Sequence, residues 1–162
     1  FQNMTKEYMA TIELGRTTPS FDLETETDRT FPVDHITEEK VKNMLKKFIG
    51  KQDQIPPAYS AKNIKGKRAY TLARAGEKFE LKPQQIEIME VELLNISLPV
   101  FTIRVVCSKG TYIRSLVRDI GLSLNSGAVM ISLRRTGIGG YRVENALTPE
   151  KFENILSETE QI

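Results

Sequence analysis

The residues best placed to do chemistry lie in segment 109–114, Lys-Gly-Thr-Tyr-Ile-Arg, between a strand pattern and a helix pattern. Glycine in such a turn lets the backbone approach a ligand, and the free N–H groups at a helix start attract phosphate or carboxylate groups. Arg114 falls in the first helical turn, where its charge opposes the helix dipole. A cation there indicates a partner carboxylate or phosphate. The alternative is an ordinary strand-to-helix turn with an arginine exposed to solvent.

Other kinds of site lack the residues that they need. Histidine and cysteine occur once each, at His35 and Cys107, so no cluster of zinc ligands is available. Polar loop sequence around His35 favours a surface histidine over a catalytic one. Cys107 falls on the apolar side of a strand pattern and is expected to be a small core residue. Glycine-rich phosphate-binding motifs are missing as well, so neither a cofactor nor a metal is expected.

Composition indicates a folded intracellular domain. The 162 residues are 40% hydrophobic and include one cysteine, which excludes a disordered chain and a disulfide framework. Because no apolar stretch approaches the roughly 20 residues of a membrane span, we expect a cytoplasmic protein with no membrane partner. The net charge is only +2, but cations cluster at residues 62–82 and 104–135. The two clusters either form a basic face for a polyanion or lie on separate solvated surfaces.

Strand patterns dominate the elements that must position segment 109–114. Alternating apolar residues predict strands at 8–14, 101–107 and 129–133, and a phase shift predicts a bulged strand within 85–98. Segment 16–35 has no period and reads as a long loop with short extended pieces. Runs of strands with isolated helices predict an α+β fold, with a mixed, mostly antiparallel sheet and flanking helices.

Two amphipathic helices are predicted, one capped by Thr37 and one that follows Gly110. Shorter helices are expected at 68–75 and after Thr148. The apolar faces of the two longer helices are Val41, Met44, Leu45, Phe48 and Ile49 in the first, and Ile113, Leu116, Val117, Ile120 and Leu124 in the second.

Further segments join 109–114 in a resemblance to a known family. The chain resembles the bacterial TruB-type tRNA pseudouridine-55 synthases in four blocks that occur in the family's order, from about Lys6 to Phe152. The blocks are residues 6–22, ending in Leu-Gly-Arg-Thr-Thr-Pro-Ser-Phe-Asp; 54–76, which begins Gln-Ile-Pro-Pro-Ala-Tyr-Ser-Ala-Lys; 107–121, from Cys-Ser-Lys-Gly to Asp-Ile-Gly; and 132–135, Ser-Leu-Arg-Arg.

This resemblance implies a pseudouridine synthase fold and an isomerase activity. The family breaks the C–N glycosidic bond of one uridine in the T loop of tRNA and rejoins the ring through carbon. It uses an aspartate nucleophile without metal or cofactor, and the uridine must leave the RNA stack. By position, Arg114 resembles the arginine that pairs with the nucleophile and holds it ionised. Tyr8 resembles the tyrosine that stacks on the flipped ring, and Tyr112 and Leu133 resemble residues that line the uracil pocket.

Residue patterns give two of these positions a second interpretation. Tyr8 shares a strand face with Ala10 and Ile12, which indicates packing in the sheet, and Leu133 is in phase with Val129 and Ile131, which indicates core. The implied partner is the T-arm stem-loop of tRNA. Contacts with this RNA are expected at Tyr59, Lys62, Lys67 and Lys109.

The chain departs from the family pattern in ways that affect activity. The family's nucleophilic aspartate lies in a loop upstream of the block that contains Tyr8, and no such loop occurs in this sequence. Asp22 and Asp119 occupy other positions of the pattern, so neither is taken as the nucleophile. A threonine, Thr25, replaces the usual glycine. We therefore expect residues 1–162 to be part of a catalytic domain, inactive or nearly so alone, without a C-terminal PUA-type domain.

Two alternatives stay open. A non-catalytic RNA-binding module could keep the fold and the basic residues without the nucleophile. A guide-RNA-dependent archaeal or eukaryotic synthase would carry extra partner-binding segments, and the compact spacing of the blocks argues against it. An aspartate loop encoded upstream of Phe1 would distinguish a synthase from a binding module.

Overall fold

The computed structural model describes residues 5–58, 63–64, 67–68, 81–138 and 141–142. The helix predicted at 68–75 is wrong at its first residue. The structure places Arg68 in a short strand, β6 (Lys67–Arg68), which pairs with β5 (Asn63–Ile64). The rest of that helix, and the one predicted after Thr148, lie outside the described residues.

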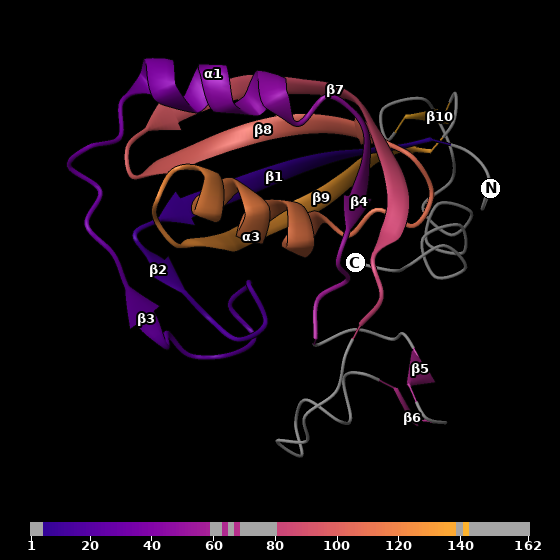
Figure 1. Ribbon diagram of the computed structural model, residues 1–162. Coiled ribbons are helices and arrows are strands. Elements are labelled where there is room, and N and C mark those ends of the chain that lie inside the picture. Colours follow the sequence, from indigo (N-terminus) through magenta and orange to yellow (C-terminus); the bar gives the residue numbers. More distant parts are fainter. Residues whose placement is uncertain (1–4, 59–62, 65–66, 69–80, 139–140, 143–162) are drawn as a thin grey trace.

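A six-stranded antiparallel sheet forms the centre of the molecule (Figure 1). Its middle strands are β1 and β8, which pair from Lys6 opposite Cys107 to Glu13 opposite Val100. The α+β class with a mostly antiparallel sheet is therefore confirmed. In spatial order the strands are β10 (Tyr141–Arg142), β9 (Ala128–Ile138), β1 (Lys6–Leu14), β8 (Val100–Cys107), β7 (Gln84–Ser97) and β4 (Gly50–Gln54).

One face of this sheet is covered by two helices, α1 (Glu38–Lys47) and α3 (Ile113–Ser123), as Figure 1 shows. The apolar side chains of β1 and β8 that alternate onto this face are buried, as their period of two predicts. The apolar faces predicted for both helices join the same core. Ile49 is an exception at 50% exposed, because α1 ends at Lys47 with Phe48 as its C-cap.

Two strands contain bulges. The bulge predicted in β7 is confirmed by register shifts between Ile88 and Glu90 and between Leu93 and Asn95. The simple alternation predicted for β9 is wrong, because its register against β1 shifts so that Ser132 faces Thr11 while Met130 faces Ile12. Met130 therefore joins the core cluster in place of Ile131, which is only partly buried.

The predicted loop at 16–35 contains a short hairpin, β2 (Arg16–Thr17) paired with β3 (Arg29–Thr30). Gly15 ends β1 with a φ of +100°, a conformation that L side chains rarely adopt. His35 is exposed, as predicted, and its Nε2 lies 2.8 Å from the carbonyl oxygen of Leu124.

Candidate functional site

The turn that leads from β8 into α3 is a compact, hydrogen-bonded connection. The amide of Ser108 donates to the carbonyl of Glu87 at 2.9 Å, and the amide of Thr111 donates to that of Ser108 at 3.3 Å. Gly110 has a φ of +82°, so the glycine predicted in this turn is required by its backbone. Cys107, at the end of β8, is buried as predicted, and burial raises the pKa of its thiol to about 11.

Strand register brings other predicted site residues to the end of the sheet where this turn lies. Cys107 pairs with Lys6 at the start of β1, and Lys6 also pairs with Ile138 near the end of β9. Tyr8 is two residues further along β1, opposite Arg135 of β9. The turn and the ends of three strands therefore meet at one place in the fold.

Arg114 is buried just inside α3, with 4% of its surface exposed, so the alternative of a solvent-exposed arginine is wrong. Its Nη1 donates to the carbonyl oxygen of Ser20 at 3.3 Å and lies 3.9 Å from Oδ2 of Asp22. A carboxylate beside this cation is what its unfavourable place in the helix dipole predicts. Asp22 is that carboxylate, although the sequence pattern did not connect it with Arg114.

The loop that carries Asp22 is held together by its own side chains. The hydroxyl of Ser20 donates to Oδ1 of Asp22 at 2.6 Å, and the amide of Glu24 donates to the same oxygen at 2.9 Å. Thr25 accepts from the amide of Ser20 at 3.1 Å, and its hydroxyl bonds the hydroxyl of Ser20 at 2.7 Å. Thr25 therefore supports the loop whose carbonyl contacts Arg114.

Tyr8 is 1% exposed and belongs to the core cluster, which confirms the packing interpretation. Nη2 of Arg135 donates to its hydroxyl at 3.0 Å, and the guanidinium lies 5.3 Å from the centre of its ring. Arg135 belongs to block 132–135, which resembles the family, but only the strand register shows that it lies opposite Tyr8.

Tyr112 and Leu133 are also drawn into the protein interior. Tyr112 is the N-cap of α3 and is 5% exposed. Burial raises the pKa of its hydroxyl, and the nearby charge of Arg114 opposes this shift only in part. Leu133 is partly buried against the core, opposite Ala10 of β1. Both residues therefore pack close to the elements that carry Arg114 and Tyr8.

Of the four residues predicted to contact RNA, the structure describes two, Lys67 and Lys109. Lys109 is exposed in the turn before α3. Lys67 lies in β6, and nothing further is described for its side chain, while Tyr59 and Lys62 are outside the described residues. Cations 104–135, all described, do not form one basic face, because Arg114 and Arg135 are buried. Arg104 lies instead among three carboxylates at 2.8 to 3.2 Å: Glu7, Glu90 and Glu92.

Gln54 at the end of β4 is a site residue that sequence reasoning missed. Its side chain bonds both the amide and the carbonyl of Tyr112, at 2.9 and 3.1 Å, and it is 3% exposed. The sequence feature that could have identified it is its place as the first residue of block 54–76, one of the four blocks that resemble the family. Its partner 58 residues away could not be inferred from that position.

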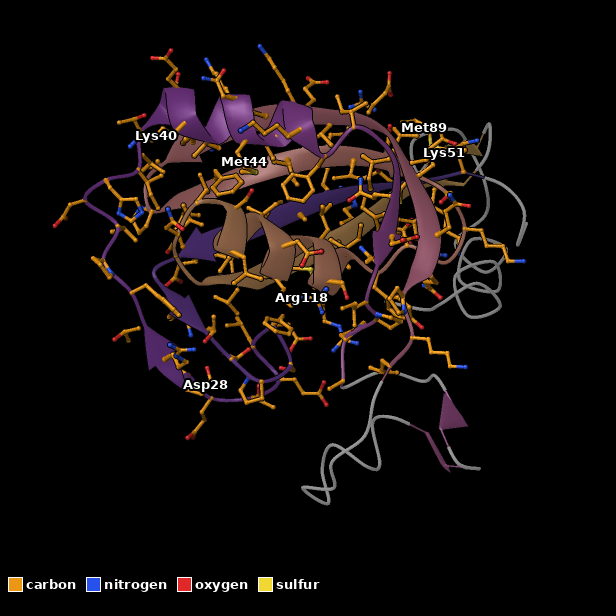
Figure 2. The ribbon with its side chains drawn as sticks, viewed as in Figure 1. Asp28, Lys40, Met44, Lys51, Met89 and Arg118 are labelled. Carbon is orange, nitrogen blue, oxygen red and sulfur yellow. The ribbon has the colours of Figure 1, made fainter. Side chains whose placement is uncertain are left out.

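A cavity of about 590 Å³ lies among segment 17–21, the β2–β3 hairpin and the second half of α3. Phe21, Arg118 and Leu122 line it together with the β2–β3 hairpin. Figure 2 shows Arg118 beneath α3 and Asp28 on the side of the hairpin. The residues predicted for catalysis and substrate binding do not line this cavity.

Within the described ranges, His, Cys, Asp and Glu side chains form no group of three or more that could hold a metal ion. The same ranges contain no helix with the length and apolar content needed to cross a membrane.

Two family models match the chain in succession. Residues 1–113 match the TruB family pseudouridylate synthase N-terminal domain, and residues 114–161 match the tRNA pseudouridylate synthase B C-terminal domain. The border falls inside α3, and β1 of the first region pairs with β9 of the second. Both matched regions therefore contribute to one continuous sheet.

The chain is similar to curated proteins over almost its whole length. A tRNA pseudouridine synthase B of Phocaeicola vulgatus is 56% identical over 160 residues, which cover 99% of this chain and 68% of that protein. One of Flavobacterium johnsoniae is 50% identical over 155 residues, which cover 96% and 68%. The chain thus spans about two thirds of the length of these relatives.

Solved structures share the fold. A crystal structure of a Cbf5-Nop10-Gar1 complex is similar with a TM-score of 0.63 and 25% identity, over 97% of this chain and 38% of that chain. A structure of an H/ACA RNP bound to a substrate RNA containing 2'-deoxyuridine gives a TM-score of 0.61 at 23% identity, over 97% and 37%. The family models and the curated relatives confirm the family and the reaction class, pseudouridine formation, that the four sequence blocks predict. The chain belongs to the TruB family of pseudouridylate synthases.

Proposed function

We propose that the protein converts one uridine in the T loop of tRNA to pseudouridine, and that Arg114 is the catalytic arginine. The observation that carries the proposal is the buried guanidinium just inside α3, directly after the turn at residues 108–112. A buried cation favours the ionised form of a nearby carboxylate, which is the form that attacks a sugar carbon.

The nucleophile in this proposal is an aspartate encoded upstream of Phe1. Asp22 lies 3.9 Å from Arg114, but its other oxygen accepts from Ser20 and from the amide of Glu24. A carboxylate held by these bonds suits the role of orienting Arg114 better than that of attacking a substrate. The chain of 162 residues is then a portion of a catalytic domain.

Tyr8, Tyr112 and Leu133 surround the flipped uracil in this account. Extrusion of the base exposes both of its faces for stacking on an aromatic ring. Because Tyr8 is 1% exposed, the side chains over its ring must move aside when the uridine enters. The hydrogen bond from Arg135 fixes the Tyr8 hydroxyl meanwhile, so that the ring keeps its orientation.

The T-arm stem-loop is held by cationic and aromatic residues in this proposal: Tyr59, Lys62, Lys67 and Lys109. Names of the relatives favour tRNA as the substrate, since those at 50 to 56% identity are tRNA pseudouridine synthases B, whereas the Cbf5 complex and the H/ACA RNP are 23 to 25% identical. A tRNA substrate also places the protein in the cytoplasm.

Release of label from the uracil 5-position tests the proposal. The natural-length protein is mixed with a T-arm stem-loop RNA that carries the label, and with a matched RNA whose target uridine is a cytidine. We expect release from the first RNA only. The 162-residue chain is expected to give no turnover, because it lacks the nucleophile.

Two results would contradict this account. Turnover by the 162-residue chain at the natural-length rate would mean that a carboxylate within it attacks the sugar. RNA binding without turnover by the natural-length protein would favour the non-catalytic binding module.

RNA contacts are tested separately through Lys67→Ala. Loss of one phosphate contact should weaken binding to all RNAs alike and reduce the slope of log K against log salt by about 1. An unchanged slope would remove Lys67 from the interface.

A further inference from the structure

Two glutamines stand side by side where the chain leaves the sheet and returns to it. Gln54 is the last residue of β4 and Gln84 the first of β7, and the two are register partners. The segment between them, residues 55–83, contains three of the proposed RNA contacts: Tyr59, Lys62 and Lys67. The two glutamines therefore form the root of that segment.

Both glutamines bond to the turn that begins α3. Nε2 of Gln84 donates to the carbonyl of Gly110 at 2.5 Å. The Gln54 amide makes a paired contact with Tyr112, in which Oε1 accepts from the backbone N–H at 2.9 Å and Nε2 donates to the backbone carbonyl at 3.1 Å. Because the N–H and the carbonyl of Tyr112 belong to the two peptide units that flank its Cα, this paired contact fixes the backbone of Tyr112 on both sides.

The start of α3 depends on these bonds because it lacks caps of its own. Its N-cap, Tyr112, makes no side-chain capping bond, and its first turn contains no acidic residue. The N–H groups of a helix start need partners from outside the helix. In a capping box a glutamate of the same helix reaches back to the N-cap amide, and here Gln54 fills that position from another strand.

Ile55, the residue after Gln54, strengthens the same connection. Its carbonyl oxygen accepts from the hydroxyl of Ser115 at 2.8 Å and from Nη2 of Arg118 at 3.0 Å. Ser115 is fully buried, and it directly follows Arg114. Contacts from the root of segment 55–83 thus fall on both sides of Arg114 along α3.

We propose that Gln54 is a positioning residue for the reaction, which holds Arg114 in place by capping α3 and joins the end of β4 to the catalytic turn. The proposal rests on the proposed function of Arg114. Gln54 reaches that residue only through the backbone of Tyr112, so it acts on the placement of the guanidinium and not on the substrate. Its loss should therefore lower the rate of chemistry more than the affinity for RNA.

The test uses natural-length protein with Gln54→Met, which keeps the size and removes both hydrogen bonds. Gln52→Met is the matched control, since Gln52 lies in the same strand and its Nε2 donates at 2.7 Å to a backbone carbonyl, that of Phe48, away from α3. Gln84→Met removes the second contact at the root. This last variant still tests the connection if Gln54→Met fails to fold.

Pseudouridine formation on T-arm RNA is measured as kcat and KM. Gln54→Met is expected to lower kcat about tenfold or more, because a small displacement of a catalytic group is costly, and to change KM by less than about threefold. Gln84→Met should lower kcat less, and Gln52→Met should leave it unchanged. Equal kcat values for Gln54→Met and Gln52→Met would overturn the proposal.

Amide hydrogen exchange gives a second measurement that needs no activity. The Tyr112 amide donates directly to Gln54, so Gln54→Met should speed its exchange while Gln52→Met does not. If wild-type protein formed no pseudouridine, the proposed function would fail, yet this comparison would still test the cap. Unchanged exchange in Gln54→Met would overturn the inference in either case.

Discussion

The two helices within the described ranges, α1 and α3, begin in opposite ways. α1 provides its own start, because the hydroxyl of Thr37 accepts from the amide of Lys40 at 3.2 Å and two glutamates occupy the first turn. α3 has an arginine in its first turn, and its capping contacts come from β4. In α1 the cap satisfies a free N–H group and the glutamates complement the positive end of the helix dipole. In α3 the cation of Arg114 is repelled by that end of the dipole.

We expect the start of α1 to affect stability and the start of α3 to affect the rate of the reaction. α1 packs on the sheet through three buried side chains and its start is exposed to solvent, so we expect its cap to affect stability alone. The start of α3 is buried, and seven of its eleven residues are buried with it. A charged group is costly to bury there, and the outside contacts with Gln54 and Ile55 fix where that charge lies.

Removal of the cation in the first turn of α3, Arg114, should have the largest effect on the rate of pseudouridine formation. Arg114→Ala is expected to lower the single-turnover rate of pseudouridine formation by about 1,000-fold, the size seen when one preorganised charge-stabilising group is lost. RNA affinity should change little, because Arg114 is buried. Rapid-quench kinetics at saturating T-arm RNA would measure the rate, and filter binding the affinity. A purely structural arginine would instead reduce stability and leave the rate of the folded fraction intact.

The segment before α3 contains a buried thiol, Cys107, which should make the free energy of unfolding decrease at alkaline pH. Burial raises the pKa of the Cys107 thiol from 9.0 to about 11, so the thiol ionises in the unfolded chain first. The buried neutral thiol therefore contributes about 2 kcal/mol to the free energy of unfolding below pH 9, and this contribution is lost as the pH rises to 11.

Urea unfolding from pH 8 to 11 measures this loss. Cys107→Ala should flatten the decline relative to wild type, because the titrating group is gone. An equal decline in both proteins would contradict burial of the thiol as the cause.

Loss of a single outside contact to α3 should affect both stability and rate. Ser115→Ala removes the bond to the carbonyl of Ile55 and should reduce the free energy of unfolding by about 1 kcal/mol. Because Ser115 is next to Arg114, the single-turnover rate should fall about threefold as well. A lower melting temperature with an unchanged rate would show that this contact is only structural.

Loss of the cap of α1 should affect stability alone. Thr37→Ala is expected to reduce the free energy of unfolding by about 1 kcal/mol, which is typical of a lost N-cap. Urea unfolding would measure that change, and the rate of pseudouridine formation should equal that of wild type. A slower rate would mean that α1 also positions the site.

Elements whose pattern is local could be predicted from the sequence. Thr37 and the apolar spacing after it predict α1, and alternation predicts β1 and β8 with their buried faces. The bulge of β9 between Ser132 and Met130 could not be predicted, because it depends on pairing with the partner strand β1.

The candidate site could be predicted in its residue types but not in its contacts. The place of Arg114 in the first turn indicated a carboxylate partner, yet nothing local identified Asp22, 92 positions earlier, as the residue 3.9 Å away. Gln54 and Arg135 were missed for the same reason. Their partners are brought near by strand pairing and by the return of the chain to the sheet, which are tertiary effects.

The most direct test of the account compares Gln54→Met with Thr37→Ala in single-turnover assays at saturating T-arm RNA, using natural-length protein. Each change removes the cap of one helix, so the two variants differ in which helix start is weakened. The account predicts that the rate of pseudouridine formation falls about tenfold or more in Gln54→Met and stays at the wild-type value in Thr37→Ala. Equal rates in the two variants would contradict the claim that the start of α3 is held from outside to position the catalytic arginine.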